Sequence, residues 1–264
     1  MSHITDKDRN AFHGVNPSTS SAQPSQEVVV EPSNDTALNI AKVFFYMFAG
    51  LLITALVAFG VGAIVYYNVV VLESENMTTI YLGMVIGAAI ALIIDMIIIN
   101  VVLLKGRHSI LVPGIIYAVL VGIMFSMLTI VIDWRLIGMA FGITAVSFAL
   151  MGLIAFLTKG NLSPILIIIM GLAIGAGLLA LFNWIYALAT GTVIETIWWV
   201  LQFAILALVM FVSLFDMWRI KKIAEAGAMN NNIALYCAFT IYTDFINVFI
   251  RILYFLVLIF GRRK

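Results

Sequence analysis

The chain has 264 residues, of which 64% are hydrophobic and only 10% are charged. A soluble domain of this length could not bury so much apolar surface in one core, so the composition indicates a protein that crosses a membrane several times. The net charge of +1 gives no field that would attract nucleic acid, and the single cysteine, Cys237, excludes an intrachain disulfide and a zinc site built on several thiolates.

The first segment, residues 1–38, is rich in Ser, Asn, Pro, Gln and Glu and contains no apolar stretch that ends in a small-residue cleavage site. We interpret it as a disordered polar extension rather than a signal peptide. Residues 39–264 form the membrane domain.

Seven apolar segments in this domain reach the roughly 20 residues that a helix needs to cross a bilayer. They are residues 40–67, 79–104, 110–132, 136–158, 164–187, 193–215 and 233–260. The connections between them are short and leave no room for a soluble domain. We therefore predict an all-α membrane protein, a bundle of seven transmembrane helices.

Glycines and tryptophans in these spans suggest how the helices pack and where they end. Three G-x-x-x-G pairs have the spacing that lets helix backbones approach closely, and we assign them to packing alone: Gly83 and Gly87, Gly138 and Gly142, and Gly171 and Gly175. Five tryptophans lie at or near span ends, where an indole keeps its ring apolar and its N–H in water: Trp134, Trp184, Trp198, Trp199 and Trp218.

The basic residues predict the orientation of the spans. If the spans alternate, one side of the membrane receives Lys42, Lys105, Arg107, Lys159, Arg219, Lys221 and Lys222, and the other receives mainly acidic loops. By the positive-inside rule the N-terminus is cytoplasmic. The basic C-terminus, residues 262–264, breaks this pattern. Either seven crossings place it outside, which we favour, or the last span is re-entrant or distorted around Asp244.

The most informative residue is Asp244, near the middle of the last apolar span. An ionised carboxylate in such a span costs at least about 2.5 kcal/mol of insertion free energy, so it requires a partner. The preceding span is followed directly by Asp216. Two carboxylates brought together repel when both are charged, so a proton is shared between them. We predict that Asp216 and Asp244 form a proton-sensitive latch and transient calcium ligands.

Other polar residues inside the spans are weaker candidates. Asp95 and Asn183 could line an ion pathway. Arg251 follows Asp244 by seven residues, which is two helical turns, so it either neutralises that acid or extends to the headgroups. Lys105 or Arg107, at the end of the second span, could provide a counter-charge for Asp216, or serve only as ordinary cytoplasmic charge.

Two segments carry a resemblance to a known family. FDMWRIKKI and, about a dozen residues later, NIALYCAFTIYTDFINVFIRIL resemble the C-terminal signature of the Bax inhibitor family, in particular its bacterial members. The pairing of D-x-x-x-I-K with Y-x-D-F-I-N is specific. Weaker similarity extends over essentially everything after residue 38.

The resemblance implies a seven-helix bundle with the last helix at its centre and a pH-sensitive calcium leak. The family's paired aspartates match Asp216 and Asp244 by motif, and its basic residue at the end of the second span matches Lys105 or Arg107. Its second-span acid matches Asp95 by position. Family members often carry the last-span arginine about one turn later than Arg251, where this chain has a tyrosine.

The leading hypothesis is a passive, pH-gated calcium pathway in the membrane, located in the plasma membrane if the source is bacterial. The alternatives are a regulatory scaffold that binds a membrane protease or a cell-death or stress component, and a proton-coupled cation exchanger. We expect no enzyme and no cofactor, because His3, His13 and His108 all lie outside the apolar spans and HExxH is absent. The expected partners are the lipid bilayer, calcium and protons, and no nucleic acid.

Overall fold

The computed structural model describes residues 34–71, 75–105 and 109–260. Within these ranges it contains seven α-helices, one short π-helical stretch and no strands. The elements are α1 (Asn34–Tyr66), η2 (Tyr67–Val71), α2 (Glu75–Lys105), α3 (Leu111–Val131), α4 (Trp134–Leu157), α5 (Ser163–Thr190), α6 (Glu195–Glu225) and α7 (Asn231–Phe260). Each of the seven α-helices is long and apolar enough to cross a membrane, which confirms the predicted fold class.

Two helices extend well beyond the predicted spans. α1 begins at Asn34, so residues 34–38, which we had assigned to the disordered extension, form its first turn. The rest of the predicted extension lies outside the described residues. α6 continues to Glu225, ten residues past the predicted end of its span, and therefore carries Asp216 inside the helix rather than beyond it.

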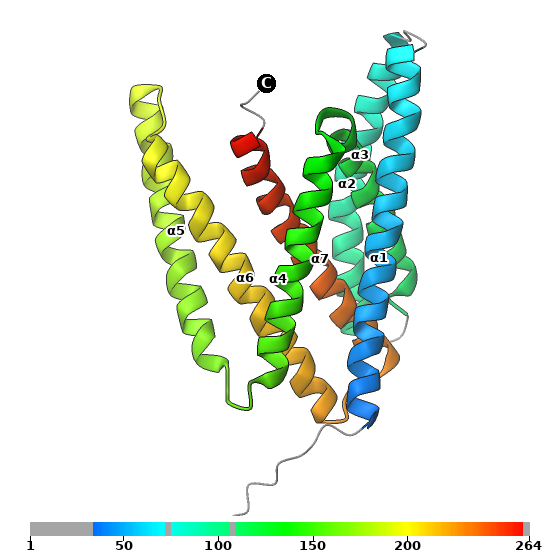
Figure 1. Cartoon of the computed structure of the whole chain (residues 1–264), viewed down its shortest axis with the longest axis vertical. Coiled ribbons are helices and arrows are strands. Elements are labelled where there is room, and N and C mark those ends of the chain that lie inside the picture. Colours follow the sequence, from blue (N-terminus) through cyan, green and yellow to red (C-terminus); the bar gives the residue numbers. More distant parts are fainter. Residues whose placement is uncertain (1–33, 72–74, 106–108, 261–264) are drawn as a thin grey trace, which may run out of the picture. The chain divides into compact units, whose positions relative to one another are not determined.

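Helix α7 lies at the centre of the bundle. It packs against α1, α3, α4 and α6, and it contributes more buried residues than any other described helix. The helix is continuous from Asn231 to Phe260, straight through Asp244, so the alternative of a re-entrant or distorted last span is wrong. Figure 1 shows α7, in orange to red, ending at the opposite end of the helices from the start of α1, as an odd number of crossings requires.

Among the described residues the most extensive contact between two helices is that of α1 with α3, and the glycines within it are not the predicted ones. A Cβ on Gly122 of α3 would lie 2.7 Å from Cβ of Val57 and 2.9 Å from the carbonyl oxygen of Thr54 on α1. A Cβ on Gly62 of α1 would meet the hydroxyl of Thr129. By contrast, a Cβ on any glycine of the three G-x-x-x-G pairs would meet no atom of the described residues within 4 Å. The prediction that these pairs bring helices of this chain together is wrong.

Candidate functional site

Two carboxyl groups meet where α6 packs against α7. Asp216 of α6 and Asp244 of α7 lie within hydrogen-bonding reach of each other. A carboxylate accepts hydrogen bonds but cannot donate one, so this contact is a hydrogen bond only when one of the two groups carries a proton. Asp244 is buried, with 8% of its surface exposed, and its Oδ2 has no donor among the described residues. We call these two residues the aspartate pair.

Asp216, unlike Asp244, lines a cavity of about 310 Å³ formed where α6 ends and α7 begins. The other lining residues come from α6, α7 and the turn between them: Arg219, Ile220, Ile223, Ala228, Ile233, Tyr236, Cys237 and Thr240. We call this space the pair cavity. Arg219 follows Asp216 by three residues on the same face of α6 and is a positive charge that acts on it. The counter-charge candidates predicted from the sequence were Lys105, Arg107 and Arg251, and Arg219 was not among them.

Ser213, one turn before Asp216 on α6, also lies within hydrogen-bonding reach of Asp244. Its Oγ also lies 2.9 Å from the carbonyl oxygen of Val209, and only 1% of the residue is exposed. A hydroxyl has one proton to donate but can also accept. Ser213 can therefore donate to an ionised Asp244, or donate to Val209 and accept from a protonated Asp244. The sequence could have indicated this residue, because Ser213 precedes Asp216 by three positions and so shares its face of the helix.

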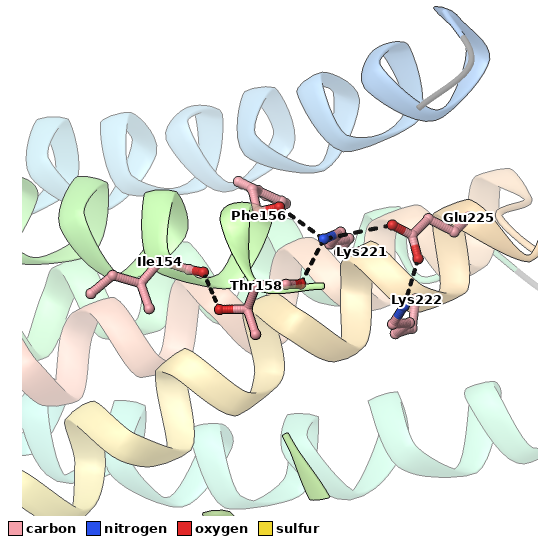
Figure 2. Close-up of polar contacts among 6 residues, drawn as sticks. All are labelled: Ile154, Phe156, Thr158, Lys221, Lys222 and Glu225. Atoms are coloured by element: carbon pink, nitrogen blue, oxygen red, sulfur yellow. Dashed lines mark hydrogen bonds and ion pairs between the residues drawn. The ribbon is translucent and has the colours of Figure 1, made fainter. Parts of the chain in front are cut away.

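The same stretch of α6 is fastened to α4 by Lys221 (Figure 2). Its Nζ donates to the carbonyl oxygens of Phe156 at 2.8 Å and Thr158 at 2.9 Å, and lies 3.7 Å from Glu225. Carbonyls in the last turn of a helix lack intrahelical partners, and a cation suits the negative pole there. Lys221 therefore caps the C-terminal end of α4 and ties it to α6. We call these contacts the Lys221 clamp.

Arg251 does not pair with the aspartates in this structure. Its Nη1 donates to Oε1 of Gln202 on α6 at 2.7 Å, and no ion pair between Arg251 and Asp244 is present in the described residues. Neutralisation of Asp244, one of the two roles considered for Arg251, is therefore not observed in the described residues. The physical reason is that both residues lie on α7, two turns apart, and a polar group on the neighbouring helix is within easier reach.

Asn183 also has a structural partner. Its Oδ1 accepts from the backbone N–H of Ile194 at 2.9 Å, which fixes the turn between α5 and α6. This turn lies at the opposite end of α6 from the aspartate pair. The structure therefore places Asn183, a predicted ion-pathway candidate, away from the aspartate pair.

Asp95 belongs to a second polar group on the other side of α7. It is buried on α2, its Oδ2 has no donor among the described residues, and Tyr117 of α3 lies near it. The ring of Tyr117 lies edge-on to Tyr242 of α7 with centroids 6.1 Å apart. The hydroxyl of Tyr242 is 2.6 Å from Oγ1 of Thr54. Tyr242 and Asp244 are two residues apart and so face opposite sides of the helix.

The structure leaves the predicted roles of Lys105 and Arg107 open and corrects that of Trp218. Lys105 is the last residue of α2, and its side chain, like Arg107 as a whole, lies outside the described residues. Trp218 was expected to keep its indole N–H in water. Instead Nε1 is buried without a partner in the described residues, and the ring packs against the core and against Phe215. The anchor interpretation of Trp218 is wrong because α6 continues past it.

Comparison with known proteins decides the family. The family model described as inhibitor of apoptosis-promoting Bax1 matches residues 37–262, which is most of the chain. The chain belongs to the Bax inhibitor family. This family member is also similar to inner membrane protein YbhL of Escherichia coli K12 and to the same protein of strain O6:H1. Each is 28% identical over 249 residues, covering 91% of this chain and 98% of the relative. These relatives confirm the resemblance to bacterial members.

Proposed function

We propose that the protein is a passive, pH-gated cation pathway with calcium as the permeant ion, and that the aspartate pair is its gate. The observation that supports this proposal is the contact of Asp216 with Asp244 where α6 packs against α7, beside a cavity that Asp216 lines. In this proposal the protein is not an enzyme and requires no cofactor. Its N-terminus is cytoplasmic, so the pair cavity opens toward the cytoplasm.

The gate works through one proton. While a proton lies between the two carboxyl groups, the hydrogen bond holds α6 and α7 together and the pathway is closed. When the proton leaves, two negative charges face each other in a medium of low dielectric constant and repel. The helices then separate, and the carboxylate oxygens become hard ligands of the kind that calcium prefers. Calcium flux should therefore rise as pH rises through the titration of the pair.

The Lys221 clamp determines which helix moves. Because Lys221 fixes α6 to the end of α4, repulsion between the aspartates acts between an α4–α6 unit and α7. Arg219 faces the pair cavity beside Asp216 and favours the ionised state of the pair.

Calcium flux into liposomes that contain only the purified protein tests the proposal, measured between about pH 5 and pH 8, where a shared carboxyl proton can titrate. Asp216→Asn and Asp244→Asn should flatten the pH dependence, because an amide cannot exchange the shared proton. Asp133→Asn is the matched control, because Asp133 is an exposed carboxylate at the start of α4 and asparagine caps a helix equally well. If both single variants titrate like the parent, the pair is not the gate.

Cys237 provides a second measurement without any mutation. It is the single cysteine of the chain, it lines the pair cavity, and only 4% of it is exposed. Separation of α6 from α7 should expose its thiol, so the rate of labelling by a charged thiol reagent should rise with pH together with the flux. Labelling must be compared with that of a small thiol peptide, because the reagent itself reacts faster as thiols ionise.

A scaffold that binds another membrane protein is the second candidate function, including a role in stress or cell death. The helix α5 favours this function. It packs against α6, and none of the residues in its most apolar stretch is buried, so most of its surface is open to a partner. Well-folded, reconstituted protein that passes no calcium at any pH would favour this function over a channel.

A further inference from the structure

A second cavity lies at the other end of α6, far along the helix from the aspartate pair. Its volume is about 420 Å³, within the range of roughly 300–1,000 Å³ that is usual for small-ligand sites. Six residues from the start of α6, the turn before it and the end of α7 line it: Val193, Glu195, Trp198, Trp199, Tyr254 and Leu258. The lining thus combines three aromatic rings with one carboxylate.

The rings are held in place by contacts between α6 and α7. Nε1 of Trp198 donates to the hydroxyl of Tyr254 at 3.2 Å, and Trp199 stacks on Phe255 with centroids 6.3 Å apart. A tryptophan that only anchors a helix at the membrane surface presents its N–H to water. Here the N–H of Trp198 is bound to the neighbouring helix, so the ring is fixed as part of the wall of a cavity.

The carboxylate of Glu195 is available for a ligand. Neither of the ion pairs in the described residues includes Glu195, and Arg251, one turn before Tyr254 on α7, donates to Gln202 instead. Glu195 lies in the first turn of α6, where a negative side chain offsets the positive pole of the helix. The cavity therefore has the Glu195 carboxyl group and three aromatic rings together in its lining.

We propose that this cavity binds an organic ammonium group. Aromatic faces attract a cation placed within about 6 Å of the ring centroid, and two tryptophans with a tyrosine are the side chains that bind alkylated ammonium groups best. The carboxylate of Glu195 adds charge attraction and accepts hydrogen bonds from a primary ammonium. Because the cavity lies where α6 begins and α7 ends, it is at the level of lipid headgroups. The ammonium can come from an ethanolamine or choline phospholipid, or from a free organic cation.

The test is lipid retention by the full-length protein in detergent, measured by native mass spectrometry. Phosphatidylethanolamine should be retained in preference to phosphatidylglycerol, which has the same phosphate but no ammonium. Glu195→Gln and Trp198→Leu should each lower that preference at least about threefold, as expected from the loss of a partly exposed cation–π or charge contact. Asp133→Asn and Trp134→Leu are matched controls, because they make the same chemical changes at the same end of the helices and should leave the preference unchanged.

A second arm distinguishes the source of the ammonium. Saturable binding of tetramethylammonium to lipid-free protein, followed by tryptophan fluorescence and lost in Glu195→Gln, would assign the cavity to free organic cations. Preference for phosphatidylethanolamine without binding of tetramethylammonium would assign it to a lipid headgroup. Equal retention of the two lipids together with no binding of tetramethylammonium would overturn the proposal. Binding of either ligand that falls equally in Glu195→Gln and Asp133→Asn would also overturn it.

Discussion

Arg251 of α7 donates a hydrogen bond to Gln202 of α6 across 2.7 Å and thereby ties the two helices together at a point two turns from Asp244. The bond turns the guanidinium toward α6. The positive charge beside the aspartate pair is instead Arg219, on α6 itself. The two arginines therefore have different roles, which single substitutions can separate.

Arg251→Gln should leave the pH midpoint of calcium flux unchanged, while Arg219→Gln should move it to higher pH. Without the positive charge of Arg219 the doubly ionised aspartate pair is less stable, so the pair loses its shared proton only at higher pH. Because Arg219 is exposed, the expected shift is about 0.2–0.7 pH unit, which corresponds to an exposed charge pair worth roughly 0.2–1 kcal/mol. A midpoint that moves more in Arg251→Gln than in Arg219→Gln would contradict this assignment.

Lys221→Met should destabilise the protein by about 1.5–3 kcal/mol, since hydrogen bonds made by a charged group contribute that much when they are partly buried. The Lys221 side chain is 12% exposed and caps two carbonyls of α4. Lys222→Met is the control, because Lys222 is 43% exposed and, among the described residues, its ammonium group pairs only with Glu225 of its own helix, so the cost should stay below about 0.5 kcal/mol. Thermal unfolding in detergent measures the stability of both variants. Equal losses of stability would show that the Lys221 clamp does not stabilise the protein.

Gly122→Ala should destabilise the bundle by about 1–3 kcal/mol, because the new methyl group would overlap Val57 and the backbone of α1. Gly142→Ala should be neutral or stabilise by up to about 1 kcal/mol, since its Cβ would meet no described residue within 4 Å and alanine favours the helix. Both residues lie in the interior of a transmembrane helix, so the pair isolates the effect of helix contact. Unfolding temperatures that fall equally in both variants would argue against close packing of α1 on α3.

The orientation can be checked with cysteines introduced into Cys237→Ala protein in intact cells. Gly160→Cys, between α4 and α5, should be protected from an impermeant thiol reagent, and Thr192→Cys, between α5 and α6, should be labelled. The reason is the concentration of Lys and Arg on the side of the membrane that includes Lys159. The reverse labelling pattern would show that the protein has the opposite orientation and that the pair cavity faces away from the cytoplasm.

The amino-acid sequence alone determined the number of membrane helices and pointed to the two acids. A bilayer offers no hydrogen bonds to an exposed backbone, so each apolar run of sufficient length has to be a helix. For the same reason, an acid placed inside such a run is costly and needs a partner, which made Asp216 and Asp244 conspicuous before any contact was known.

Only the tertiary structure decided which surfaces meet. Helical periodicity shows which residues share a face but does not show which neighbour that face contacts. Hence the G-x-x-x-G pairs lie open while Gly62 and Gly122 carry the close approach of α1 to α3. Arg251 likewise bonds to Gln202 rather than to Asp244, and Lys221 caps a helix that ends more than sixty residues earlier in the chain. Within a membrane the hydrophobic effect does not choose between apolar faces, so the fit of side chains between helices makes that choice.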